Sequence, residues 1–364
     1  MLNRMVFPGK YFQGSNALEQ FALCTETMGK SFMLFGTKTA LKAARDKIEK
    51  SFEDKDVKFV FELSHGRPVN SEYERIEKLL LDSGCTTAVA IGGGGIIDMV
   101  RAAALKNGKG LVVVPTTVAS DAACTNVSLH YSEDGSTIIG GDLLPRNPDI
   151  VIVDTTVLAN APVRMLLAGV GDALATYYEA RTCYNNGVEQ MGGAGITYTT
   201  MKMAELCRDM LFQFGEKAVA DCREHKTTPE FEKTVEACAF LSGVACLNAG
   251  CSGAHGLGDH ISTMPGGHDW LHGERVAVGL VMQLIIEEYD MSEIEKVLTF
   301  LIRCGVPATI KDLGYENLEE TARFLGSGAE NDHLVSNMRS SNHSAAAIER
   351  ACLEAVRLSE KIKG

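Results

Sequence analysis

The sequence predicts two parts that differ in secondary structure: an α/β domain with a parallel sheet over residues 1–160, then an all-helical domain over residues 161–364. In the first part, short apolar runs alternate with longer amphipathic segments, as in a parallel sheet wrapped by helices. Runs such as TTAVAI and LVVVP are continuously apolar, as expected for strands buried on both faces. Strand signals almost vanish after Asp154, where long alanine- and leucine-rich segments take over.

Each element of the first part has its own signal. β-Branched and aromatic residues predict strands at Phe32–Phe35, Val57–Phe61, Thr86–Ile91, Leu111–Val114 and Ile150–Val153. Amphipathic spacing predicts helices at about Thr39–Lys50, Ser71–Ser83 and Ile96–Lys106. Residues 132–147 interrupt this alternation and indicate a hairpin or a loop excursion.

The second part is predicted to be all helical. Its helices are expected at Met165–Thr182, Tyr198–Phe214, Thr234–His260, Leu271–Asp290, Ser292–Cys304 and Ser344–Lys361. The stretch 169–180 is apolar nearly all round, which predicts a helix buried in a bundle. Residues 160–162 mark the boundary, because a proline there suits a helix start. An α/β half followed by a helical half implies a cleft, where small-molecule sites prefer to form.

The composition excludes several classes of function. The 364 residues carry a net charge of −12, which argues against a broad nucleic-acid-binding surface. The longest apolar stretch, Val276–Ile286, is roughly half the ~20 residues that a membrane helix needs. The N-terminus lacks the sustained apolar region of a secretory signal. Eleven scattered cysteines without a C-x-x-C pair predict reduced core residues of a cytoplasmic protein.

Four consecutive glycines, Gly92–Gly95, follow a strong strand and open a helix. Such a loop lets the backbone approach a phosphate closely, and the helix start adds oriented N–H groups. The loop matches neither the G-x-G-x-x-G nor the G-x-x-x-x-G-K-[ST] motif, and a sharp strand-to-helix turn is the alternative. Asp98 is expected to serve the helix start. A second loop, Pro115–Thr125, places small hydroxyl residues after the next strand, where open α/β sheets bind ligands.

A group of histidines and one aspartate indicates a metal site. His255, His260, His268 and His272 fall within eighteen residues, and imidazole is the commonest protein ligand for divalent metals. For His260 and His268, a place in a loop or interface is the favoured interpretation. Asp172 lies in an apolar helix, where a carboxylate pairs with a base, faces water or binds a metal.

The stretch His268-Asp-Trp-Leu-His272 also imitates the H-E-x-x-H helix of zinc proteases. Aspartate replaces the glutamate base and is one methylene shorter, so its reach to a bound water would differ. A dinucleotide-like half has no place in a protease. We therefore place this interpretation well behind the others.

Taken together, these motifs resemble the metal-dependent, iron-containing type of alcohol dehydrogenase superfamily, most closely its glycerol dehydrogenase branch. The resemblance covers nearly the whole chain and implies a Rossmann-like dinucleotide-binding domain followed by a helical metal-binding domain, the fold shared with dehydroquinate synthase. The pieces that carry it are Pro8–Gly14, Gly92–Gly94 with Asp98, Val114–Thr116, Ser120–Ala122, Leu144–Asp149, Gly171–Thr176 and His272–Glu274.

The resemblance assigns roles residue by residue. It implies that Asp172, His255 and His272 bind one divalent metal, zinc in the first place and iron as the alternative, and that Asp121 contacts a polyol substrate. NAD or NADP is the implied cofactor. The residues implied to hold it are Gly92, Gly93, Gly94, Gly95, Ile96, Thr116, Thr117, Thr125, Val127 and Tyr131.

Three positions depart from the family pattern. Gly95 stands where lysine is common, and Gly258 stands where a second histidine usually follows the first ligand. After the second strand, Gly36-Thr37-Lys38 replaces the acidic residue that holds the adenine ribose. Because a cation tolerates a 2′-phosphate that a carboxylate would repel, we expect NADP to be accepted at least comparably to NAD.

The leading hypothesis is reversible hydride transfer between NAD(P) and a secondary hydroxyl of a small, glycerol-like 1,2-diol, giving the ketone. The first alternative is a phosphorylated polyol, as in glycerol-1-phosphate dehydrogenases, and the second is a lyase or cyclase like dehydroquinate synthase. A non-catalytic binding protein is a third, although the metal set is intact. We expect a homo-oligomer that acts on a small alcohol and contacts neither nucleic acid nor membrane.

Overall fold

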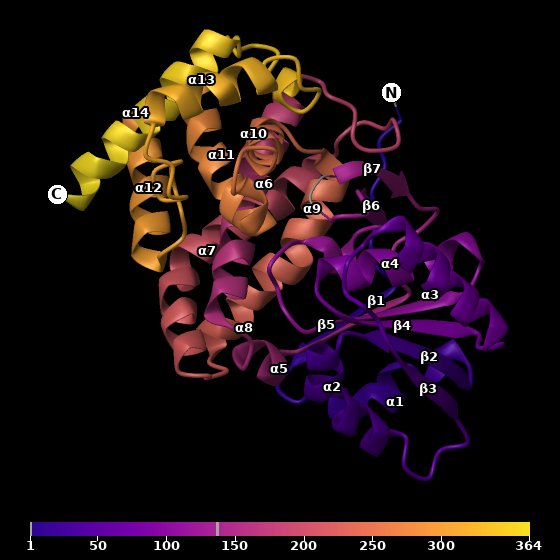
Figure 1. The fold of residues 1–364 in the computed structure, drawn as a ribbon. Coiled ribbons are helices and arrows are strands. Elements are labelled where there is room, and N and C mark those ends of the chain that lie inside the picture. The colour runs from indigo at the N-terminus through magenta and orange to yellow at the C-terminus, as the bar shows by residue number, and fades with distance from the viewer. Residues whose placement is uncertain (1, 136–137) are drawn as a thin grey trace.

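The computed structural model describes residues 2–135 and 138–364. The first part is a six-stranded sheet in the order β1-β8-β5-β4-β2-β3 (Figure 1), and all its neighbouring strands pair in parallel. Its strands are β1 (Lys10–Gly14), β2 (Ser31–Gly36), β3 (Lys58–Leu63), β4 (Thr87–Gly92), β5 (Gly110–Pro115) and β8 (Ile150–Asp154). The predicted parallel sheet is therefore confirmed, with all five expected strands in place.

Helices cover both faces of this sheet. They are α1 (Phe21–Cys24), α2 (Lys38–Ser51), α3 (Asn70–Asp82) and α4 (Gly94–Lys106). Phe32 and Leu34 of β2 pack in one core with α1 and α2. Met33 and Phe35 point the other way, into a core with α3 and α4. Burial on both faces explains why the central strands read as continuous apolar runs.

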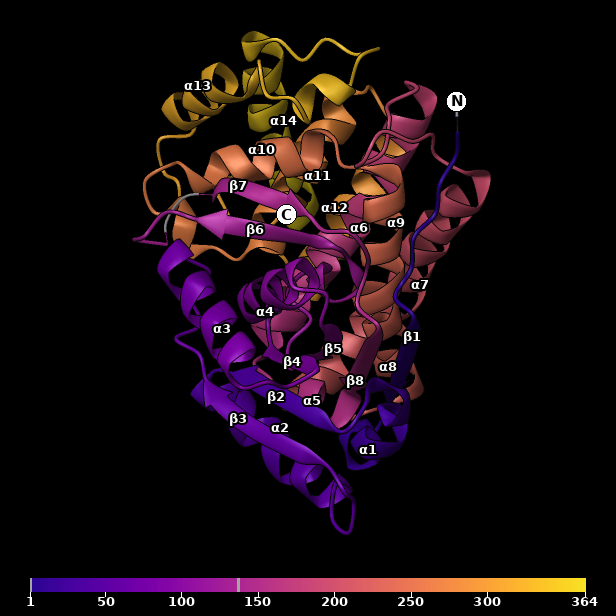
Figure 2. The same ribbon diagram turned by 90° about the vertical axis from the view of Figure 1, so that its right-hand side faces the viewer.

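An antiparallel hairpin leaves the sheet after β5. It consists of β6 (Val127–Tyr131) and β7 (Ile138–Leu143), and in Figure 2 it lies between the α/β part and α10. An excursion was expected at residues 132–147, as a hairpin or a loop, and a hairpin is present; its bounds were wrong, because β6 ends at Tyr131 and only β7 lies inside the expected range. Residues 136–137 of that segment lie outside the described residues.

The second part is helical, as predicted. Its helices are α5 (Thr155–Ala159), α6 (Val163–Asn185), α7 (Tyr198–Arg223), α8 (Pro229–Glu236), α9 (Ser242–Ala249), α10 (Gly253–Ser262), α11 (His272–Ile286), α12 (Met291–Cys304), α13 (Leu318–Ala329) and α14 (Ala345–Lys363). Pro162 directly precedes α6. Helix α6 packs against α7, α9 and α11, and the predicted burial of its apolar stretch is confirmed.

Three details of the sequence interpretation are wrong. The single helix expected at Thr234–His260 contains a π-helical turn at Ala237–Leu241 and breaks between α9 and α10, where Gly250 adopts φ +88°. Strand β1 was not expected, because it is a partly exposed edge strand with no apolar run. Helix α13 was also missed, and its short apolar face packs on α14.

Within the described ranges, no single helix is both long and apolar enough to cross a membrane. The segments Pro229–Ala249 and Gly253–Ser262 satisfy the length and composition criteria only as a pair, and the chain bends by 103° between them. Most side chains of this pair are buried inside the helical part.

Candidate metal centre and nucleotide cleft

Two connected cavities lie between the α/β part and the helical part. The first, of about 640 Å³, runs along the carboxyl ends of β4 and β5. The second, of about 1230 Å³, continues from it toward α10 and α11. Gly94, Gly95 and Leu271 line both, so they form one continuous cleft. This is the place where open α/β sheets bind their ligands.

The glycine loop forms the floor of the first cavity. Strand β4 ends at Gly92, Gly93 caps the helix, and α4 starts at Gly94. A Cβ atom on Gly93 would stand 3.0 Å from the Thr117 hydroxyl, and one on Gly95 would stand 3.3 Å from the Gly66 carbonyl. The first N–H groups of an α-helix have no intrahelical partner. Because these residues are glycines, no side chain covers the backbone N–H groups at the start of α4, which face the cleft.

The structure brings most of the expected cofactor residues to the cleft. Gly93, Gly94, Gly95, Ile96, Thr116 and Thr117 line the first cavity. Thr125, Val127 and Tyr131 line the second, through the η3 turn (Ala122–Cys124) and strand β6 that follow the hydroxyl-rich loop. Gly92 does not line either cavity: it is buried at the end of β4, where a Cβ atom would stand 2.9 Å from the Ile96 side chain. Lys38 does not line this cleft but an adjoining surface groove with Lys42 and Arg45.

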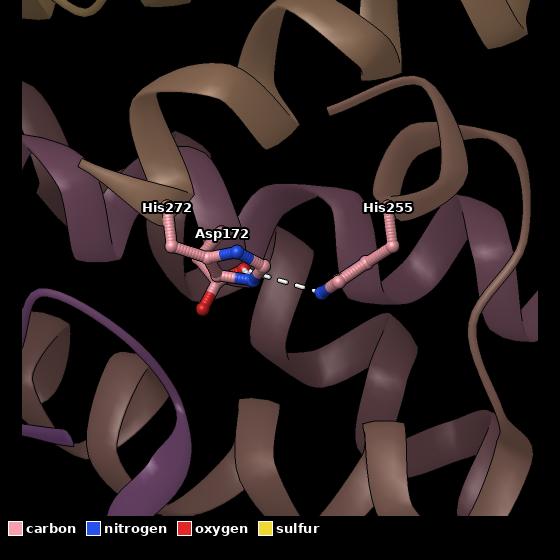
Figure 3. Close-up of side chains that lie close together, drawn as sticks. All are labelled: Asp172, His255 and His272. Carbon is pink, nitrogen blue, oxygen red and sulfur yellow. Dashed lines mark ion pairs between the residues drawn. The ribbon is translucent and has the colours of Figure 1, made fainter. Parts of the chain in front are cut away.

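Asp172, His255 and His272 converge from α6, α10 and α11 (Figure 3), and the two histidines line the second cavity. Nε2 of His255 and Nε2 of His272 each lie 3.5 Å from Oδ1 of Asp172. One ligand atom from each residue falls within 4.8 Å of the others. Three elements that are distant in sequence thus place two imidazoles and a carboxylate around one point.

Small residues make this convergence possible. A Cβ atom on Gly273, next to His272, would stand 1.9 Å from the Ala168 carbonyl oxygen of α6. A Cβ atom on Gly279 of α11 would stand 2.2 Å from the Ala254 carbonyl, next to His255. Only glycine lets backbones approach so closely. The glycines that flank the ligands therefore set the distances between the three helices.

The three residues fit a divalent metal. Oδ1 of Asp172 is buried and has no hydrogen-bond partner, whereas Oδ2 accepts from the backbone N–H of Asp121 at 3.1 Å. A buried, unpartnered carboxylate oxygen is costly unless something else satisfies it. Two imidazoles, which bind a metal in their deprotonated form, and one carboxylate make a three-ligand set of the catalytic zinc type, which leaves a position open.

Glu179 is a residue of the candidate site that the sequence reasoning missed. It lies seven residues after Asp172 on α6, and therefore on the same helical face. Its Oε2 lies 2.6 Å from Nδ1 of His255, and its Oε1 accepts from the backbone N–H groups of Ser252 and His255. The sequence offered one signal for it, because Glu179 is a second carboxylate in the helix that was predicted to be buried. Glu179 fixes the His255 ring so that Nε2 faces Asp172.

The charges of the site are strongly coupled. Burial and the neighbouring Asp121 carboxylate raise the pKa of Asp172. Burial alone would lower the pKa of His255, but the adjacent Glu179 carboxylate holds it well above its ordinary value. Burial, the His255 charge and Arg275 lower the pKa of His272. A cation at this point would satisfy the crowded carboxylates.

The structure places Asp98, His260 and His268 outside the metal cluster. Asp98 does not serve the helix start: it is buried in α4, pairs with Arg101 at 3.0 Å and accepts from the Leu129 backbone at 3.3 Å. His268 lies in an exposed 3-10 turn and His260 faces Asp332 at 3.6 Å, so neither joins the metal set. Because His268 precedes α11 while His272 opens it, the two do not share a helix, as the zinc-protease motif requires.

Comparison with known sequences agrees with this site. The profile described as "Iron-containing alcohol dehydrogenase" matches residues 8–155. A glycerol dehydrogenase of Escherichia coli is 35% identical over 306 residues, which cover 84% of this chain and 83% of that protein. The chain belongs to the iron-containing alcohol dehydrogenase family. A glycerol dehydrogenase of Thermotoga maritima is 32% identical and covers 88% of the chain and 87% of its own length.

Solved structures of the family share the whole fold. A probable glycerol dehydrogenase from Sinorhizobium meliloti superimposes with a TM-score of 0.91 at 29% identity, over 99% of this chain and all of its own. Glycerol dehydrogenase from Schizosaccharomyces pombe gives 0.93 at 26% identity, over 99% and 92% of the two chains. The family's members are oxidoreductases that act on CH–OH groups, and so is this chain.

Proposed function

We propose that this enzyme uses NAD(P) to interconvert a small 1,2-diol or polyol and its ketone. The observation that carries the proposal is the cleft itself, in which a nucleotide-sized cavity over the glycine loop opens onto the Asp172, His255 and His272 cluster. Family membership implies a divalent metal and a nicotinamide cofactor. When bound, the metal supplies a Lewis acid for the substrate oxygen and the nicotinamide exchanges hydride.

The chain's own residues position the reactants. The glycine loop offers backbone N–H groups to the pyrophosphate. Asp172, His255 and His272 hold the metal, zinc in the first place. Asp121 is fixed by its backbone N–H on Asp172 and keeps a buried Oδ2 without a partner. This oxygen is available to a second substrate hydroxyl, which favours diols over simple alcohols.

The charge of the cleft supports a substrate without a negative charge. Among the described residues, the lining of the second cavity includes a single arginine, Arg67, and five aspartates: Asp98, Asp121, Asp134, Asp259 and Asp269. A phosphate needs clustered cations or free N–H groups. The phosphorylated polyol is therefore the weaker alternative. The relatives named glycerol dehydrogenase support a neutral polyol.

The proposal also includes a cytoplasmic location, a homo-oligomer and the use of NADP. The eleven free thiols support a cytoplasmic location. Exposed apolar side chains near the N-terminus, among them Leu2 and Phe7, support a homo-oligomer. We keep NADP as a cofactor accepted at least comparably to NAD, because no carboxylate follows β2.

A substrate panel tests the proposal. The zinc-loaded enzyme is mixed with glycerol, other 1,2-diols, monohydric alcohols, glycerol phosphates and hydroxy acids, each with NAD and with NADP, and reduced nicotinamide is measured. Net reduction with 1,2-diols at the highest kcat/KM supports the proposal, and net reduction also separates it from a lyase that recycles its NAD. A preference for phosphorylated substrates would contradict it.

A further inference from the structure

A pair of cysteines lies in the wall of the substrate cleft. All eleven cysteines are buried and free, but only Cys246 and Cys251 line the two cavities of the cleft. Their Sγ atoms are 3.1 Å apart, about 1 Å more than the length of a disulfide bond. The cleft gives small solutes a path to both sulfurs.

The backbone between them is already folded to bring the two thiols together. Cys246 lies in the last turn of α9, and Gly250 reverses the chain with φ +88°. The Gly250 N–H donates to the Cys246 carbonyl at 2.7 Å. Cys251 therefore returns toward Cys246 before α10 begins. Closing the remaining distance needs a small shift of side chains rather than a new backbone path.

Both sulfurs are also connected to the proposed site. Cys246 lines the same cavity as Asp121, the proposed substrate contact. Cys251 directly precedes Ser252, whose N–H donates to Glu179, the residue that holds His255. A covalent bond between the thiols would change the wall of the cavity that Asp121 also lines. It would also pull on the segment that carries His255.

We propose that Cys246 and Cys251 are a reversible modification site that forms a disulfide when a hydroperoxide enters the cleft. The hydroperoxide transfers an oxygen atom to Cys246, its O–O bond breaks, and Cys246 becomes a sulfenic acid. The Cys251 sulfur then attacks the Cys246 sulfur, the S–O bond breaks, and water leaves. With hydrogen peroxide, two thiols and one peroxide give one disulfide and two waters.

The hydrogen bond between the thiols and burial raise the pKa of Cys251 well above the ordinary thiol value. The same hydrogen bond lowers the pKa of Cys246, but burial and the nearby Asp121 carboxylate keep it above the ordinary value. Because the thiolate is the reactive form, oxidation is expected to be slow and to need excess peroxide. The other nine cysteines are buried away from the cleft. We therefore expect peroxide to oxidise this pair rather than the other cysteines, because the pair is accessible from the cleft and each sulfur has the other close by.

The experiment treats the full-length, metal-loaded enzyme with excess hydrogen peroxide and follows its intact mass and its thiol count. The expected product has lost two hydrogens and two of its eleven thiols, and dithiothreitol restores both. Chymotryptic cleavage after Leu247 should leave the two fragments joined through sulfur. An enzyme that keeps all its thiols, or that gains oxygen without a crosslink, would overturn the proposal.

Variants separate this pair from the other cysteines. Cys246→Ser and Cys251→Ser should each abolish the crosslink. Cys183→Ser is the matched control, because the Cys183 thiol donates to the Cys251 carbonyl at 3.3 Å yet lies outside the cleft. It should crosslink like the wild type, and a crosslink lost only in this variant would contradict the assignment. If a serine variant does not fold, the wild-type fragment map alone decides.

The chemical readout does not depend on the proposed function, whereas the effect on turnover rests on it. Fully crosslinked enzyme should oxidise the best alcohol at least several-fold more slowly, with recovery after reduction. Unchanged turnover would overturn the placement of the pair at the substrate subsite. An enzyme that crosslinks but oxidises no alcohol before treatment would contradict the proposed function alone.

Discussion

Gly273 lies so close to Ala168 that a Cβ atom at residue 273 would stand 1.9 Å from the Ala168 carbonyl oxygen. This contact joins the start of α11, where His272 lies, to α6 four residues before Asp172. The spacing of two metal ligands therefore depends on the absence of a side chain. It explains why glycine follows His272 without any need for an unusual backbone angle.

We predict that Gly273→Ala separates α6 from α11. Overpacking of this kind typically costs about 1–3 kcal/mol of unfolding free energy, and it should weaken metal binding as well. Urea unfolding and metal titration measure the two effects. Gly328→Ala is the control, since its Cβ would stand 3.3 Å from the His260 ring and needs only a small adjustment. Equal stability and metal affinity in both variants would contradict the account.

Glu179 should control metal affinity without being a ligand. In Glu179→Gln, the amide oxygen can still accept from the Ser252 and His255 N–H groups, which leaves the NH₂ group facing Nδ1 of His255. That arrangement favours the tautomer with the proton on Nε2, where the metal needs a lone pair. We expect metal affinity to fall about 10–100-fold, as for other outer-shell partners.

Competition with a chelator measures this loss in the Glu179→Gln enzyme. Glu287→Gln is the matched control, because Glu287 is a half-buried carboxylate that accepts from Thr182 and Gln283 rather than from a ligand. It should keep its metal. Equal losses in the two variants would mean that Glu179 acts only through general stability.

Gly94→Val tests the glycine loop. A Cβ atom at residue 94 would stand 3.3 Å from the Ser120 hydroxyl, and the branched side chain would occupy space over the start of α4. Pyrophosphate could then no longer approach the backbone N–H groups. Fluorescence titration with reduced nicotinamide dinucleotide should give a Kd at least tenfold higher, while metal content stays unchanged. An unaltered Kd would rule out this loop as the pyrophosphate site.

Glu72 should make stability depend on pH. Burial alone would raise the pKa of Glu72, but hydrogen bonds from Arg75, His65 and Ser64 lower it to about 2 from an ordinary 4.5. The carboxylate therefore stabilises the fold fully above about pH 4.5, and this contribution is lost as the pH falls toward 2. It fixes the turn before Gly66, which lines the cleft.

The measurement for Glu72 is the difference in unfolding free energy between wild type and Glu72→Gln at several pH values. The difference should be constant above about pH 5 and shrink below 4.5. Glu74→Gln, on the exposed side of the same helix, serves as the control and should unfold like wild type. A difference that grows on acidification would show that the sign is wrong.

The sequence predicts the sheet well because buried parallel strands are continuous apolar runs that little else in a soluble protein imitates. It predicts β1 poorly, because an edge strand such as Lys10–Gly14 is specified by its partner β8 rather than by its own pattern. The break at Gly250 escapes notice for a similar reason, since residues on both sides are apolar and helical. Tertiary contacts decide both cases.

The candidate site divides in the same way. Glycines and histidines in a distinctive order point to the cofactor loop and to Asp172, His255 and His272. The role of Glu179 depends on the angle at which α6 meets α10, which no local pattern encodes. The pairing of Cys246 with Cys251 depends on the turn between two helices. Contacts of this kind, between residues on different helices, can be recognised only in the folded structure.

The central claim is that Asp172, His255 and His272 hold one metal ion. The most direct test is the metal content of His272→Ala compared with His268→Ala, which removes an exposed histidine four residues before His272. Both proteins are purified with zinc, dialysed and analysed by atomic emission. The account predicts about one metal per chain in His268→Ala and little or none in His272→Ala. Stoichiometric metal in His272→Ala would contradict it.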